Sequence, residues 1–178
     1  KSHMAKRSNF QRLERDYYPT PLAAVKPLIP HLPQHGTYIE PCAGDNRLVQ
    51  HISVLTEDKM KCLFSCDIEP QNTDVIRMNA MDFPENITAQ YFITNPPWDR
   101  QILHPLINYL RNQRPTWLLF DADWAHTKQS SDYMPYCIKI ISIGRVRWIE
   151  GSKMSGKDNC AWYLFDKNPV GQTSFYGR

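Results

Sequence analysis

Short apolar runs alternate with amphipathic stretches along the chain. Apolar residues at helical spacing predict helices over residues 46–55 and 102–110. Thr20 and Pro21 predict a further short helix, with Thr20 as N-cap and Pro21 at the first helical position. Seven strands are predicted, over residues 37–40, 61–67, 75–79, 90–94, 116–121, 137–149 and 160–165. The pattern is typical of an α/β domain around a mainly parallel sheet.

The last two predicted strands are joined differently from the others. Residues 151–159 between them are polar and glycine-bracketed, and they carry no helical pattern. Parallel strands need a crossover connection, usually helical, whereas antiparallel strands do not. We therefore expect a parallel sheet that ends in an antiparallel hairpin.

A carboxylate ends the first predicted strand, and a turn of small residues leads from it into a helix. Ligands of open α/β sheets bind at the carboxyl ends of strands, where small residues let the backbone approach closely. Glu40 would counter a cationic amino group, while Ala43 and Gly44 would leave room for the body of a cofactor. An ordinary strand-to-helix connection explains this segment equally well when it is taken alone.

Two more acids follow predicted strands. Asp67, with Ile68 after it, begins about twenty residues beyond the turn, where nucleotide-binding folds place the acid that bonds ribose hydroxyls. Asp82 would accept hydrogens from a cofactor adenine, with Phe83 packing nearby. Acids at strand ends are also common turn formers, so each signal is modest by itself.

The most specific segment is Asn95-Pro96-Pro97-Trp98, directly after a buried strand. The prolines end strand pairing and hold the loop stiff. Such a loop would aim the Asn95 side-chain oxygen and the Pro96 carbonyl at one point, where they would bind both hydrogens of a planar NH2 group. A buried structural Pro-Pro loop is the simpler alternative.

That geometry suits methylation of an exocyclic amine. The amino nitrogen of adenine is a poor nucleophile because its lone pair is delocalised into the ring. Two acceptors would favour a pyramidal nitrogen, and most of the catalysis would be positioning and fixed dipoles. Trp98 would offer a face to a base taken out of its stack, a contact worth roughly 1–3 kcal/mol.

Charge adds a weaker indication. The net charge of +3 is compatible with a polyanionic partner without requiring one. Ordinary solvated charge accounts equally well for the two basic clusters. They comprise Lys6, Arg7, Arg12 and Arg15 near the start, and Arg145, Arg147, Lys153 and Lys157 near the last hairpin.

Composition and residue spacing indicate neither a metal-binding protein nor a membrane protein. The five cysteines are irregularly spaced and no histidines fall at a zinc spacing, so no metal site is expected. Without a membrane-length apolar run, no membrane association is expected, and a cytoplasmic location is the default. Residues 1–3 look like a remnant of an expression tag, which leaves one domain over residues 4–178.

Asn95-Pro96-Pro97-Trp98 fully matches the signature of the DNA adenine N6-methyltransferases, a branch of the class I S-adenosylmethionine-dependent methyltransferases. The chain resembles this family over nearly its whole length, with the cofactor motifs before the catalytic one, as in the gamma-type order. The resemblance implies a Rossmann-like fold and S-adenosylmethionine as cofactor. It implies cofactor contacts from Tyr18, Pro19, Thr20, Glu40, Pro41, Ala43, Gly44, Asp45, Asp67, Ile68, Asp82 and Phe83.

The sequence departs from the family in two respects. Asn46 stands where the cofactor loop more often has a second glycine, although asparagine tolerates positive φ. No separate target-recognition domain is evident, so residues 124–135, residues 151–159 or the basic N-terminus would read the target. Small free-standing members of this kind are typical of phages and prophages.

The sequence thus predicts methylation of adenine N6 in DNA. Three alternatives stay open: the same reaction on RNA, methylation of a protein glutamine, and a cofactor-binding module without catalysis. Arg145, Arg147, Lys153 and Lys157 are the predicted phosphate contacts. The oligomeric state and the target site are not specified by the sequence.

Overall fold

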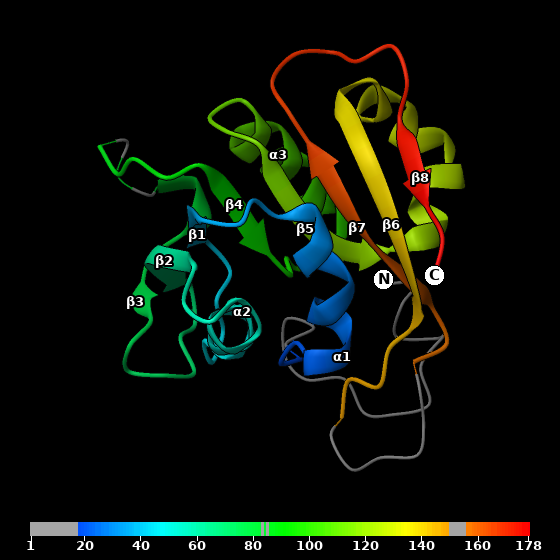
Figure 1. The fold of residues 1–178 in the computed structure, drawn as a ribbon. Coiled ribbons are helices and arrows are strands. Elements are labelled where there is room, and N and C mark those ends of the chain that lie inside the picture. The colour runs from blue at the N-terminus through cyan, green and yellow to red at the C-terminus, as the bar shows by residue number, and fades with distance from the viewer. Residues whose placement is uncertain (1–17, 83, 85, 150–155) are drawn as a thin grey trace.

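The computed structural model describes residues 18–82, 84, 86–149 and 156–178, and these build one eight-stranded sheet (Figure 1). The strands are β1 Gly36–Glu40, β2 Met60–Asp67, β3 Ile76–Arg77, β4 Tyr91–Thr94, β5 Thr116–Asp121, β6 Cys137–Arg145, β7 Asn159–Phe165 and β8 Ser174–Tyr176. The α-helices are α1 Leu22–Val25, α2 Arg47–Thr56 and α3 Arg100–Arg111. Short 3-10 turns are η3 Lys26–His31, η4 Ala80–Asp82, η5 Ala122–His126, η6 Lys128–Asp132 and η7 Met134–Tyr136.

The strand order is β3-β2-β1-β4-β5-β7-β6-β8. Among the described strands, β7 alone runs antiparallel to its neighbours, β5 and β6. The predicted mainly parallel sheet and its β6–β7 antiparallel pair are therefore confirmed. The order reverses between β1 and β4, and in open α/β sheets such a switch point is where ligands bind, at the carboxyl ends of the strands.

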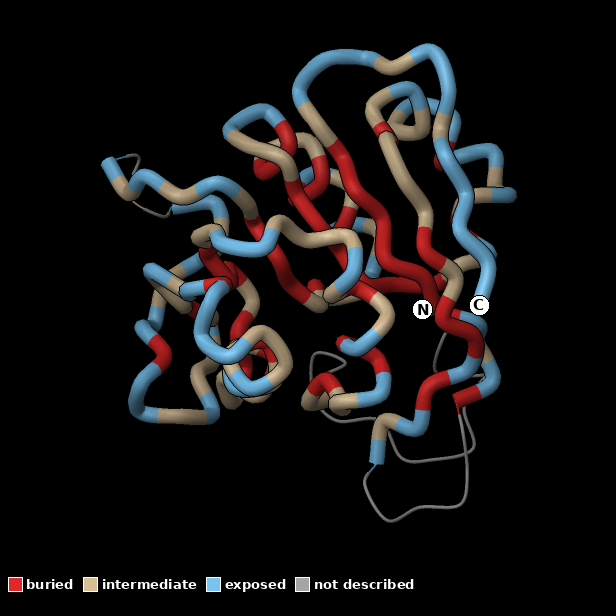
Figure 2. The backbone as a smooth tube through the Cα atoms, viewed as in Figure 1, coloured by how far each residue is buried: buried red, intermediate tan, exposed pale blue. Residues whose placement is uncertain are grey.

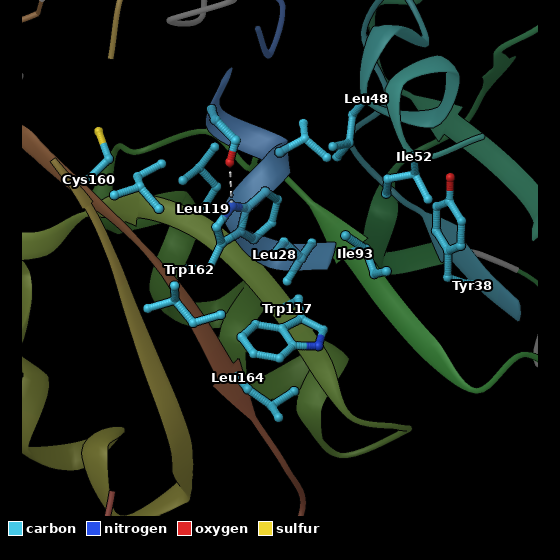
Figure 3. Close-up of a cluster of buried hydrophobic side chains, with 14 of the residues drawn as sticks. Leu28, Tyr38, Leu48, Ile52, Ile93, Trp117, Leu119, Cys160, Trp162 and Leu164 are labelled. Atoms are coloured by element: carbon cyan, nitrogen blue, oxygen red, sulfur yellow. Dashed lines mark hydrogen bonds between the residues drawn. The ribbon is translucent and has the colours of Figure 1, made fainter. Parts of the chain in front are cut away.

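Period-two alternation along the central strands divides the core into two layers. On one face, side chains such as Tyr38 and Trp162 pack against α1, η3 and α2 (Figure 3). On the other, side chains such as Phe92 and Tyr163 pack against α3. β5 is buried along its entire length and contributes Trp117 and Leu119 to the first layer and Leu118 and Phe120 to the second. The central strands are correspondingly red in Figure 2.

The predicted helix start at Thr20 is wrong. The N-cap of α1 is Pro21, which has no side chain able to cap, and the helix begins at Leu22. Thr20 is instead buried, and its hydroxyl accepts a hydrogen bond from the Asn95 side chain, so tertiary contact determines its role. The helix is short, as predicted, and gives way to the proline-containing turn η3.

Two strand predictions also need correction, and one strand was not predicted. β3 is only two residues long, and β6 ends at Arg145 rather than at residue 149. The end of β6 follows a register shift at Gly144, whose φ of +75° disturbs regular pairing. β8 was not predicted, because three exposed residues carry no alternating pattern; it pairs in parallel with β6 at the sheet edge. Within the described part of the chain, no helix has the length and apolarity to cross a membrane.

Two buried tryptophans allow a matched test of the packing between α1 and β7. The indole N–H of Trp162 donates to the Ala24 carbonyl at 2.8 Å, whereas buried Trp117 has no partner for its indole N–H among the described residues. Trp162→Phe and Trp117→Phe remove the same ring volume, but only the first breaks a hydrogen bond. We expect Trp162→Phe to lower the free energy of unfolding by about 1–2 kcal/mol more than Trp117→Phe, measured by urea denaturation. Equal losses would contradict a stabilising role for this bond.

Candidate active site

A cleft of about 600 Å³ opens at the carboxyl edge of the sheet, where β1, β2 and β4 end. This size is within the range of small-molecule and cofactor sites. Most residues predicted to bind the cofactor line it. They are Tyr18, Pro19, Thr20, Glu40, Pro41, Ala43, Gly44, Asp45, Asp67 and Ile68. From the predicted catalytic segment, Asn95, Pro96 and Pro97 also line this cleft.

The shape of the turn after β1 is set by two residues with positive φ and by a hydrogen bond to Asp67 at the end of β2. Gly44 and Asn46 adopt φ values of 57° and 71°, so the asparagine does accept the left-handed conformation expected of a glycine. The Gly44 N–H donates to the Asp67 carboxylate at 2.9 Å, and the other Asp67 oxygen accepts from the Glu69 N–H at 2.8 Å. Asp67 therefore organises the turn as well as facing the cleft.

Glu40 is the most deeply buried acid of the cleft, only 1% exposed. One carboxyl oxygen accepts from the Thr94 hydroxyl at 2.9 Å, whereas the other lacks a hydrogen-bond partner among the described residues. Burial, and secondarily the nearby Asp67 charge, raises the pKa of Glu40 well above its ordinary value. The hydrogen bond from the Thr94 hydroxyl opposes that rise in pKa only in part.

A buried carboxyl with an unpaired oxygen is costly unless a ligand completes it. An ammonium group would satisfy that oxygen and restore the ionised form of Glu40. The residues of the cleft therefore fit a ligand with a cationic amino end, the property for which Glu40 was singled out in the sequence.

Asn95 follows β4 on the opposite side of the strand-order switch from the Asp67 turn. Its side-chain NH2 donates to the Thr20 hydroxyl at 3.3 Å, and its oxygen accepts from the Trp98 indole N–H at 3.1 Å. Trp98 itself is not part of the cleft wall. Its ring packs edge-on against Trp148, with ring centroids 5.7 Å apart.

The last two predicted cofactor residues are not among those that line the cleft as described. Asp82 is exposed at the end of η4, and the three residues before it, 79–81, line the cleft in its place. Phe83 lies outside the described residues. The adenine-binding role of both stays a prediction.

The predicted phosphate contacts gather at the same edge of the sheet as the cleft. Arg145 ends β6, Arg147 follows it, and Lys157 precedes the antiparallel strand β7; all three are exposed. Lys153 and the basic N-terminal cluster fall outside the described part of the chain. In the part that is described, no group of three or more His, Cys, Asp or Glu side chains is placed to hold a metal ion.

Sequence reasoning missed the part of the cleft wall that α3 contributes. Gln101, Ile102, Pro105 and Leu106 come from the first turns of this helix. Ile102 was assigned to the apolar face of the helix, yet it is 43% exposed. The available signal was an apolar residue at helical spacing only a few positions beyond the 95–98 segment. Further residues missed were Cys42, Leu48, Glu69, Gln71, Asn79, Ala80 and Met81.

The sequence matches no protein-family model and no curated protein. Solved structures share its fold at low sequence identity. A Listeria monocytogenes protein named as a class I S-adenosylmethionine-dependent methyltransferase superposes with a TM-score of 0.59 at 8% identity, over 95% of this chain and 68% of that one. A Pyrococcus horikoshii protein named as an RNA methyltransferase gives 0.59 at 13% identity, over 90% and 91% of the two chains.

The chain has the fold of class I methyltransferases. The M protein of the type I restriction enzyme EcoKI is also similar, with a TM-score of 0.55 at 12% identity. The match covers 93% of this chain and 49% of the M protein, so the chain spans about half the length of that protein. The predicted Rossmann-like fold class is therefore confirmed.

The raised pKa of Glu40 has opposite consequences for folding and for ligand binding. A carboxyl whose pKa is raised on folding stabilises the protein at low pH, and this contribution is lost as pH rises through the raised pKa. Glu40→Gln should therefore remove part of the fall in thermal stability between pH 5 and pH 8. It should also weaken binding of S-adenosylmethionine at least tenfold, about the effect of losing a hydrogen bond to a charged group.

Scanning calorimetry and isothermal titration calorimetry across this pH range measure the two effects. Wild-type affinity should rise with pH as Glu40 ionises, whereas the affinity of Glu40→Gln should not. Glu57→Gln, an exposed change outside the cleft, is the matched control. Unchanged ligand affinity in Glu40→Gln would disprove the proposed pairing with an amino group.

Proposed function

We propose that this chain transfers a methyl group from S-adenosylmethionine to the N6 amino group of adenine in DNA. The observation that carries the proposal is the position of two side chains at adjacent strand ends. The buried Glu40 carboxyl and the Asn95 amide line one cleft, and the hydroxyl of Thr94, the residue before Asn95, donates to the Glu40 carboxyl at 2.9 Å. A site for a cationic amino end thus lies beside an acceptor suited to a planar amine.

Different residues of the cleft would contact different parts of the cofactor. Glu40 would receive its amino group, and the turn at Gly44 would lie against its body, where a larger side chain would be strained at positive φ. Asp67, with Glu69 beside it, would face the ribose hydroxyls. When bound, S-adenosylmethionine supplies an electrophilic methyl group.

The chain's own contribution to the reaction would be orientation. The Asn95 oxygen and the Pro96 carbonyl would accept the two hydrogens of the target amine, which favours a pyramidal nitrogen with an available lone pair. Pro96 and Pro97 keep this turn from relaxing, because each ring fixes φ. Fixed acceptors of this kind need no reorganisation when charge develops.

DNA is favoured as substrate by the match of residues 95–98 to the DNA adenine N6-methyltransferase signature and by exposed cations near the cleft. Similar structures include the EcoKI M protein and an RNA methyltransferase, so RNA is the comparison that the experiment must include. The same pair of acceptors would also fit the amide of a glutamine side chain.

Incubation with methyl-labelled cofactor tests the proposal directly. Duplex DNA, RNA of identical sequence and a mixed protein extract are the three substrates, followed by identification of the modified nucleoside or amino acid. We expect labelled N6-methyladenine in DNA. Label in RNA or in glutamine alone would reject DNA as the substrate, and no label in any of them would reject the enzymatic function.

Asn95→Ala separates the catalytic role of Asn95 from cofactor binding. The change removes the side-chain acceptor but leaves the hydrogen bond from Thr94 to Glu40 in place. We expect kcat to fall by about 100-fold or more, comparable to removing one preorganised transition-state contact, with the cofactor Kd within about threefold of wild type. Asn112→Ala, an exposed change outside the cleft, is the control. A tenfold loss of cofactor affinity in Asn95→Ala would contradict this division of roles.

The cationic edge predicts a change in the salt dependence of DNA binding. Neutralising Arg145, Arg147 and Lys157 together with glutamine should flatten the slope of log K against log salt concentration by about 2–3. The matched control neutralises exposed lysines at the opposite edge of the sheet, namely Lys59, Lys61 and Lys167. Fluorescence anisotropy with duplex DNA at several salt concentrations measures both slopes, and equal slopes for the two triple variants would refute the assignment.

A further inference from the structure

Both ends of the Asn95 amide already have partners within the protein. The Trp98 indole nitrogen lies 3.1 Å from the Asn95 oxygen, and the Asn95 nitrogen lies 3.3 Å from the Thr20 hydroxyl. Thr20 belongs to the segment before α1, so the amide is held from two parts of the chain that are far apart in sequence.

The chemistry of these partners selects one of the two ways in which an amide can face. An indole N–H only donates, so the end of the amide beside Trp98 has to be the oxygen. The Thr20 hydroxyl can rotate to accept, so it tolerates the NH2 end. Turning the amide over would set two donors, the NH2 group and the indole N–H, against each other. The hydrogen bond from Trp98 therefore determines which way the Asn95 amide faces.

Trp98 is itself braced from the end of β6. Its ring meets that of Trp148 edge-on, at an interplanar angle of 81°. Trp148 lies against Gly156, where an added Cβ would come within 3.3 Å of its ring. The Gly156 N–H donates to the Val146 carbonyl at 2.9 Å, which holds Gly156 next to the end of β6. The donor that meets Asn95 is thus held by packing.

We infer that Trp98 is a positioning residue that orients the Asn95 amide through its indole N–H. A carbonyl oxygen has two lone pairs, and Trp98 uses one of them. The other remains available to a substrate amine, with the oxygen, not the NH2 group, kept at the bonding position. The nature of that amine rests on the proposed function, whereas the orientation of the amide does not.

A carboxylate in place of the amide separates this role from a stacking platform for a base. Asn95→Asp presents two equivalent acceptor oxygens, so no donor is needed to orient it. Trp98→Phe keeps an aromatic ring and removes the indole N–H. We expect Trp98→Phe to lower kcat about tenfold in the wild-type background, the effect of one hydrogen bond.

In the Asn95→Asp background, the same Trp98→Phe change should lower kcat less than threefold. A stacking role alone predicts an equal loss in both backgrounds, expressed mainly in KM, and that result would overturn the inference. Trp117→Phe is the matched control, because Trp117 lies outside the cleft wall and its indole N–H has no partner among the described residues. It should change the cofactor Kd and kcat by less than threefold.

A measurement without substrate tests the orientation independently of methyl transfer. The indole N–H resonance of Trp98 is assigned by its loss in Trp98→Phe, and its hydrogen exchange is followed by NMR. We expect exchange to become at least tenfold faster in Asn95→Ala and to stay slow in Asn95→Asp. Unchanged exchange in Asn95→Ala would overturn the inference, whereas a chain that methylates no substrate yet shows this pattern would overturn only the proposed function.

Discussion

The rest of the site depends on the hydrogen bond between the buried Glu40 carboxyl and the Thr94 hydroxyl. Glu40 ends β1 and accepts a hydrogen bond from Thr94, which ends β4, so this bond joins two strands across the point where the strand order reverses. A charge in this position would be costly without a partner, which explains the raised pKa of the carboxyl. The same interaction places the turn at residues 95–98 at a fixed position relative to the turn after β1.

The two layers of the core make this placement rigid. Tyr38 and Ile39, just before Glu40, pack into opposite layers, and Ile93 and Phe92 do the same before Thr94. Each strand is therefore held from both faces immediately before the residue that enters the cleft. Close packing transmits position better than a loop does, which suits a reaction that depends on aiming acceptors at a small group.

Local sequence predicted what local sequence determines. The central strands and α2 follow from periodicity, and the cleft residues at strand ends follow from small turns, acids and the stiff 95–98 segment. The failures share a cause. The role of Thr20 and the edge strand β8 are fixed by contacts between segments far apart in the chain, and the exposed Ile102 has the same apolar spacing as its buried neighbours. The spacing of apolar residues along one segment cannot predict contacts with distant segments.

Trp98 illustrates why a motif match leaves a residue's role open. From the sequence it offered an aromatic face, yet the structure uses its polar edge, bonded to Asn95, while its ring is packed against Trp148. A half-buried amide near an apolar core needs internal partners, since an unpaired polar group there would be costly. If those partners also decide which end of the amide faces the substrate, the same two hydrogen bonds stabilise the folded protein and orient the amide for the reaction. The aromatic residue that follows the two prolines would then contribute through whichever of its atoms the surrounding packing leaves closest to the amide.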